Sequence, residues 1–132
     1  MPALDRPVVK PRPVYLNLLA IRQPLPAVIS ILHRVSGALL FLLGIPVLLW
    51  GMDATLSSPE AFAQWKATMS HPIAKLLLLL LAWSYIHHLL AGIRHLVLDV
   101  HVGIDLQSAR RSASIVFIVA LILTALVAVR LW

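Results

Sequence analysis

Two adjacent histidines, His87 and His88, lie within an apolar stretch that is long enough to cross a membrane. The stretch includes six consecutive leucines before the histidines and continues to Gly92 after them. A helix of about 20 apolar residues spans the hydrocarbon core of a bilayer. Because ionisable side chains inside such a helix are costly, they usually mark a functional site. The pair therefore predicts a membrane protein with a site within the bilayer.

The composition also predicts an integral membrane protein. Of the 132 residues, 61% are hydrophobic and the mean hydropathy is +0.93, whereas about 45–50% of a soluble domain is apolar. The net charge of +6 does not indicate nucleic-acid binding, because Lys and Arg flank apolar segments as membrane topology requires. The absence of cysteine excludes thiolate catalysis and cysteine-held zinc or iron–sulfur clusters. Metal or redox chemistry must therefore use the six histidines.

The expected fold is all-α and integral to the membrane, with three transmembrane helices in an antiparallel bundle that forms one membrane-anchor domain. The chain divides into a tail at 1–26 and spans at about 27–51, 72–98 and 112–131. Pro46 is expected to kink the first span. In the first loop, residues 57–60 (Ser-Ser-Pro-Glu) place a capping serine before a proline and an early glutamate. This pattern predicts the start of a short amphipathic helix on the membrane surface.

The distribution of basic residues predicts the orientation. The tail and the second loop carry more of them than the first loop and the C-terminus do. On one side lie Arg6, Lys10, Arg12, Arg22, Arg94, Arg110 and Arg111, and on the other Lys66, Lys75 and Arg130. Because basic residues concentrate on the cytoplasmic side of membrane proteins, the N-terminal tail is expected in the cytoplasm and the C-terminus in the periplasm.

Polar residues gather on one face of the first span. Ser30, His33, Arg34 and Gly37 are spaced i, i+3, i+4 and i+7, so they share a helical face. An arginine at bilayer depth costs about 2.5–3.5 kcal/mol on insertion scales. No acidic residue lies within a span, so Arg34 needs a ligand, a cofactor carboxylate or another subunit as its partner. The alternative is that Arg34 reaches the lipid headgroups.

A similar face on the second span approaches the same side of the membrane. His88, Gly92 and His95 share one helical stripe, whereas His87 and Arg94 lie on the neighbouring one. A glycine one turn from His88 makes room for a flat group against the helix, which favours His88 as a haem ligand. Haem propionates would then supply anions to His33, Arg34, Arg94 or His95. The alternative for each histidine is hydrogen bonding across helices, and His87 is expected to be a packing or hydrogen-bonding residue of this kind.

These segments resemble the cytochrome b subunit of bacterial succinate dehydrogenase, the larger of the two membrane anchors of respiratory complex II. The resemblance covers nearly the whole chain. Its most specific segments are Ser-Ile-Leu-His-Arg-Val-Ser-Gly at 30–37 and His-Leu-Leu-Ala-Gly-Ile-Arg-His at 88–95, supported by residues 12–18, 57–60, 110–113 and Asp99.

The resemblance implies an anchor of the bacterial inner membrane that pairs with a second small membrane subunit. A flavoprotein subunit and an iron–sulfur subunit would dock on its cytoplasmic face, and electrons from succinate would reach ubiquinone. The chain would not itself oxidise succinate. Ser30 and Arg34 correspond to quinone-site residues and His88 to an axial ligand of haem b, whose second ligand comes from the other anchor. His33 and His95, with Arg94, would contact the haem propionates.

Two other functions remain compatible with the residues alone. A self-contained b-type cytochrome would use His33 and His88 as its two axial ligands. A non-redox proton-relay or transport subunit would use buried histidines that titrate without binding iron.

Overall fold

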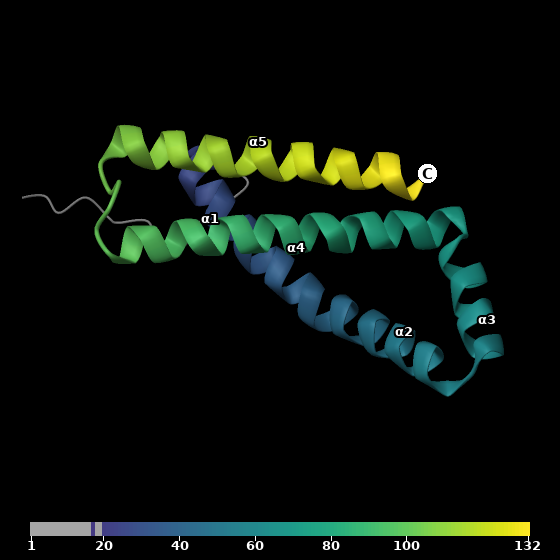
Figure 1. Cartoon of the computed structure of the whole chain (residues 1–132). Helices are drawn as coiled ribbons and strands as arrows, with labels where there is room; N and C mark the ends of the chain where they lie inside the picture. The colour runs from purple at the N-terminus through teal and green to yellow at the C-terminus, as the bar shows by residue number, and fades with distance from the viewer. Residues whose placement is uncertain (1–16, 18–19) are drawn as a thin grey trace, which may run out of the picture.

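The structure is a computed structural model that describes residue 17 and residues 20–132, and every regular element in this part is a helix (Figure 1). Three helical segments are long and apolar enough to cross a membrane, at Leu25–Ser57, Pro72–Asp99 and Leu106–Leu131. The prediction of an all-α membrane protein with three spans is confirmed. Most of the tail lies outside the described residues. The elements are α1 (Leu25–Leu39), the π-helical η1 (Leu40–Gly44), α2 (Ile45–Ser57), α3 (Pro59–Met69), α4 (Pro72–Asp99) and α5 (Leu106–Leu131).

The helix α4 lies in the middle of the bundle. It runs beside α5 along much of its length, and α1 packs against both of them (Figure 1). Small side chains line these contacts: Ala91, Ala113 and Ala120 are all fully buried. Small residues allow helices in a membrane to approach closely, so that van der Waals packing can stabilise the bundle.

The first span changes its hydrogen-bond pattern just before Pro46. The amide of Ile45 donates to the carbonyl of Leu40, five residues back, at the end of η1. Pro46 has no amide proton, and its ring would crowd the carbonyl four residues earlier, so a wider turn at this point relieves the conflict. Beyond η1 the helices α2 and α4 diverge, and α2 packs against α3 (Figure 1).

Each remaining helix begins at a side chain that accepts a hydrogen bond from the first turn. Ser58 caps α3 by accepting from the amide of Ala61 at 3.1 Å, as the sequence of the first loop predicts. The position of α3 on a membrane surface stays a prediction. Asp105 caps α5 by accepting from the amide of Ser108 at 2.9 Å. Hydrogen bonds from the side chain and the amide of Ser108 lower the pKa of the Asp105 carboxyl. Because Asp105 is the cap, α5 begins at Leu106, six residues before the span expected at 112–131.

Three glycines on the first span are seven residues apart and face neighbouring helices. A methyl group built at Gly37 would lie 2.8 Å from Cε1 of His88, and one at Gly51 would lie 3.0 Å from Cζ2 of Trp65. At Gly44 the nearest side-chain atom, which belongs to Leu40 on the same span, would be 3.5 Å away. Gly37 and Gly51 therefore permit contacts that a larger residue would block.

Candidate functional site

Three histidines meet where α1 begins and α4 ends. The rings of His33 and His88 are stacked, with centroids 4.1 Å apart and planes inclined by 14°. The ring of His95 lies 5.1 Å from that of His33 at an inclination of 57°. All three side chains are partly exposed. The predicted convergence of these residues from two helices is confirmed, while their roles stay predictions.

The orientation of His88 is fixed by hydrogen bonds to α1. Its Nδ1 lies 2.9 Å from the carbonyl oxygen of His33 and 3.2 Å from Oγ of Ser36. The Ser36 hydroxyl donates to the same carbonyl at 2.9 Å. A carbonyl oxygen can only accept, so Nδ1 is the donor in this contact. Nε2 has no hydrogen-bond partner among the described residues, which leaves it available to a metal.

Two glycines make room for the histidine rings, in a different way from the one expected. Gly37 on α1 makes room for His88, whose Nδ1 would lie 3.2 Å from a methyl group there. Gly92 on α4 faces Nε2 of His33, which would be 3.5 Å from such a methyl. The sequence assigned the space at Gly92 to a group bound by His88. In this structure Nε2 of His33 lies beside that space, because α1 crosses α4 at this point.

His87 points away from the cluster into the helix bundle. Its side chain is fully buried, and its ring stacks on that of Trp83 with centroids 5.3 Å apart. Neither ring nitrogen has a hydrogen-bond partner among the described residues, and the same holds for the buried hydroxyl of Ser84. Of the two roles expected for His87, packing and hydrogen bonding across helices, these contacts show packing. His87 is a packing residue in this structure.

The two arginines predicted at the site have different surroundings. Arg34 is exposed, one residue after His33, and Ser30 is partly buried one turn earlier on α1. Arg94 is buried, and its Nε donates to Oγ of Ser112 at 3.0 Å. Its Nη2 donates to the carbonyl of Ala109 at 3.2 Å. Arg94 thus joins α4 to α5, whereas His95 turns to α1.

The stacking of His33 on His88 bears on how iron could bind here. Axial ligands approach a haem iron from opposite faces, with the porphyrin between them. His33 and His88 lie face to face at 4.1 Å, so no porphyrin fits between their rings. The described residues contain no group of three or more His, Cys, Asp or Glu side chains that could hold a bare metal ion. Axial ligation of one haem iron by both histidines would therefore require the two rings to separate.

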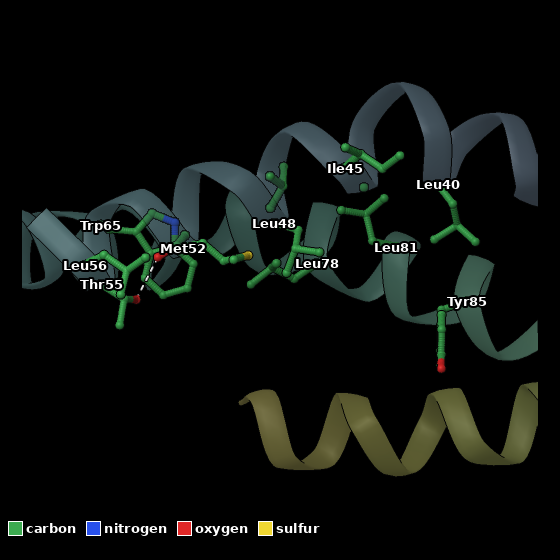
Figure 2. Close-up of a pocket in the computed structure, with 13 residues that line it drawn as sticks. Leu40, Ile45, Leu48, Met52, Thr55, Leu56, Trp65, Leu78, Leu81 and Tyr85 are labelled. Carbon is green, nitrogen blue, oxygen red and sulfur yellow. Dashed lines mark hydrogen bonds between the residues drawn. The ribbon is translucent and has the colours of Figure 1, made fainter.

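A large groove lies at the end of the bundle opposite to the histidine cluster. It has a volume of about 680 Å³ and lies where α2 diverges from α4, with Trp65 of α3 closing one end (Figure 2). Figure 2 shows that apolar side chains line most of it, with Tyr85 at the end nearer to His88. This groove was not predicted from the sequence, in which Pro46 is the one signal of it. Its lining suits apolar groups such as lipid chains or the side chains of another helix.

Comparisons with known proteins place these features in a family. Residues 9–127 match the model of the succinate dehydrogenase/fumarate reductase transmembrane subunits. The chain is 34% identical over 102 residues to the succinate dehydrogenase cytochrome b556 subunit of Paracoccus denitrificans, covering 77% of this chain and 78% of that protein. It is 34% identical over 122 residues to the subunit of the same name from Coxiella burnetii, covering 92% and 97%. The corresponding Rickettsia prowazekii subunit is 27% identical over 126 residues, covering 96% and 98%.

Proposed function

The chain belongs to the family of succinate dehydrogenase/fumarate reductase transmembrane subunits, and on this premise we propose that it binds haem b and forms part of a ubiquinone site. It is a non-catalytic subunit of an enzyme complex. The observation that carries the proposal is the state of His88. Its Nδ1 is held by α1, and its Nε2 is available in a partly exposed cluster.

The residues present fit a haem. A histidine that donates from one ring nitrogen to a carbonyl is oriented to bind iron through the other, and His88 has this arrangement. Its relatives are named cytochrome b subunits. When bound, haem b takes up and releases single electrons. His33 and His95, beside the His88 ring, would hold its propionates. Arg94 is less suited to this role, because it is buried and two of its donors are directed to α5.

Ser30 and Arg34 would form this chain's part of the quinone site. The exposed guanidinium of Arg34 and the hydroxyl of Ser30 lie on α1 near the histidine cluster. Arg34 would stabilise negative charge that develops on a quinone oxygen during reduction, and Ser30 would hydrogen-bond the quinone or its surroundings. The exposure of Arg34 supports this role, because the side chain is available to a ligand.

The partly exposed site would be completed by other chains. A second small membrane subunit would supply the second axial ligand of the haem. The iron–sulfur and flavoprotein subunits would dock at the end where α1 begins, on the cytoplasmic side of a bacterial inner membrane. This orientation places the N-terminus in the cytoplasm and the C-terminus in the periplasm. It agrees with the excess of basic residues in the N-terminal tail and the loop between α4 and α5.

The stacked histidines favour this proposal over a self-contained cytochrome. In a self-contained cytochrome, His33 and His88 would have to separate before both could bind one iron. A variant His33→Ala should therefore keep the haem and change its potential, whereas a self-contained cytochrome would lose the haem. The proton-relay alternative predicts that the complex contains no b-type haem at all.

The proposal is tested by the reduced-minus-oxidised absorption spectrum of the purified complex. We expect a b-type band in the wild type and its loss in His88→Ala. His101→Asn, in the exposed loop between α4 and α5, is a matched control that should keep the band. A wild-type complex without the band, or a full band in His88→Ala, would contradict the proposal.

A further inference from the structure

Ser36 and Gly37 contact His88 but have no part in the function proposed so far. We propose that both are positioning residues for the haem ligand, and that Ser36 tunes the reduction potential of the haem through Nδ1 of His88. The inference rests on the proposed haem site and assigns a role to two residues within it. It follows from three features of the contact between α1 and α4.

The first feature is the burial of Ser36 against the ring. Ser36 is fully buried, although it lies on the same face of α1 as the partly exposed His33. Its hydroxyl proton is used on the carbonyl of His33, so the lone pairs of Oγ face Nδ1 of His88 at 3.2 Å. The proton on Nδ1 is therefore shared between two acceptors, Oγ of Ser36 and the carbonyl of His33.

The second feature is the electronic effect of that sharing. A ligand histidine that donates a hydrogen bond from Nδ1 becomes more basic at Nε2. A more basic ligand stabilises the oxidised iron more than the reduced iron, which lowers the reduction potential. Removing the hydroxyl of Ser36 takes away one acceptor and leaves the carbonyl of His33 in place. The potential should therefore rise while the haem stays bound.

The third feature is the close approach at Gly37. A methyl group there would lie 2.8 Å from Cε1, 3.2 Å from Nδ1 and 3.7 Å from Nε2 of His88. These distances leave no space for a side chain, so alanine at this position must push the ring away from α1. The push would also break the hydrogen bonds of Nδ1. Alanine is favourable in a helix, and the effect of this variant is therefore steric.

The test is a redox titration of the haem in the intact complex carrying Ser36→Ala. We expect the oxidation equilibrium to shift about threefold, which is about 28 mV toward positive potentials at 59 mV per tenfold change. Ser36→Cys should shift it less, because a thiol is a weak acceptor of similar size. Ser84→Ala is the matched control, since Ser84 is also a fully buried serine but its hydroxyl contacts no ligand.

A second pair of variants tests the steric part. Gly37→Ala should lower the haem content of the purified complex and change the electron paramagnetic resonance signal of the haem. Gly44→Ala, where the nearest side-chain atom would be 3.5 Å away, should leave both unchanged. Haem content is measured from the pyridine haemochrome spectrum, so neither readout depends on enzyme activity.

The results separate failure of the inference from failure of the proposed function. A wild-type complex without haem would overturn both. A wild-type haem whose potential is the same in Ser36→Ala, or shifts equally in Ser84→Ala, would overturn the role of Ser36 alone. Normal haem content and an unchanged resonance signal in Gly37→Ala would overturn the role of Gly37.

Discussion

His87 and His88 are neighbours in sequence but have different surroundings, because successive residues on an α-helix are about 100° apart. One ring is buried against Trp83 without a hydrogen bond, and the other is held by α1 at the partly exposed cluster. The spacing from Gly92 identified His88 as the candidate ligand. The structure adds that the glycine in contact with the His88 ring is Gly37.

His87→Leu tests this division. Both ring nitrogens of His87 are buried without partners, and each unsatisfied buried polar group costs about 1–3 kcal/mol. The variant should keep its haem and raise the free energy of unfolding by about 1–3 kcal/mol. Thermal unfolding in detergent and the haem absorption spectrum measure the two effects. Loss of the haem would identify His87 as the ligand.

Arg34→Ala tests the quinone site. Loss of the charge should reduce succinate:ubiquinone activity by up to about 100-fold, the lower end of the range for removing one donor to a developing anion. Succinate oxidation by an artificial acceptor should be largely unchanged, because the chemistry on succinate takes place on another subunit. Arg130→Ala, an exposed arginine near the C-terminus, is the control. Equal loss of both activities would argue against a quinone-site role for Arg34.

The contact between the helices α4 and α5 depends on Arg94. This buried side chain donates to Ser112 and Ala109 at 3.0 and 3.2 Å, and hydrogen bonds from a charged group are worth about 1.5–3 kcal/mol each. Arg94→Ala should lower the free energy of unfolding by about 3–6 kcal/mol without changing the haem potential. Ser112→Ala should cost less, since one acceptor remains. Chemical denaturation of the purified complex measures the loss, and a changed potential would instead support the predicted propionate contact.

The elements were largely predictable from the sequence because their signals are local. Apolar stretches of sufficient length predict the spans, and Ser58 beside Pro59 marks the start of α3 as the structure shows it. The helix α5 begins before the span expected at 112–131, because a span is judged by its apolar residues, whereas the helix begins at its cap, Asp105.

The contacts of the site were predictable only in outline. The similar depth of His33 and His88 along the two predicted spans indicated that they lie close together. Their stacking and the contact with Ser36 depend on how α1 and α4 cross. No local pattern encodes that crossing. The π-helical turn before Pro46 is a further case. A proline predicts that the helix is interrupted, but it does not determine whether a kink or a π-helical turn results.

The whole molecule is a bundle with few buried residues. The described core consists mainly of small side chains, and large apolar residues along every span remain exposed. The groove of about 680 Å³ between α2 and α4 adds further apolar surface. Lipid or other subunits must cover this surface, which agrees with the family's place in a multisubunit enzyme.

The orientation of the whole chain is tested with reporter fusions. An alkaline phosphatase joined after Trp132 should be active, because three spans would carry the C-terminus to the periplasm when the N-terminus is cytoplasmic. The same reporter joined in the loop between α4 and α5 should be inactive. The reverse pattern would place the histidine cluster near the periplasmic side and remove the cytoplasmic docking face from the proposal.

The π-helical turn at Leu40–Gly44 also determines how the chain would respond to a change in length. A π-helical turn contains one residue more than an α-helical turn, so a deletion there could restore a regular α-helix. Because the extra residue is taken up within that one turn, the helix beyond it would keep its orientation about the axis, and Gly51 would stay aligned with Trp65. The contact of Gly37 with His88 lies before the turn and would keep its register. A one-residue deletion in this segment would thus spare both contacts, whereas the same deletion within α2 before Gly51 would rotate Gly51 by about 100° away from Trp65.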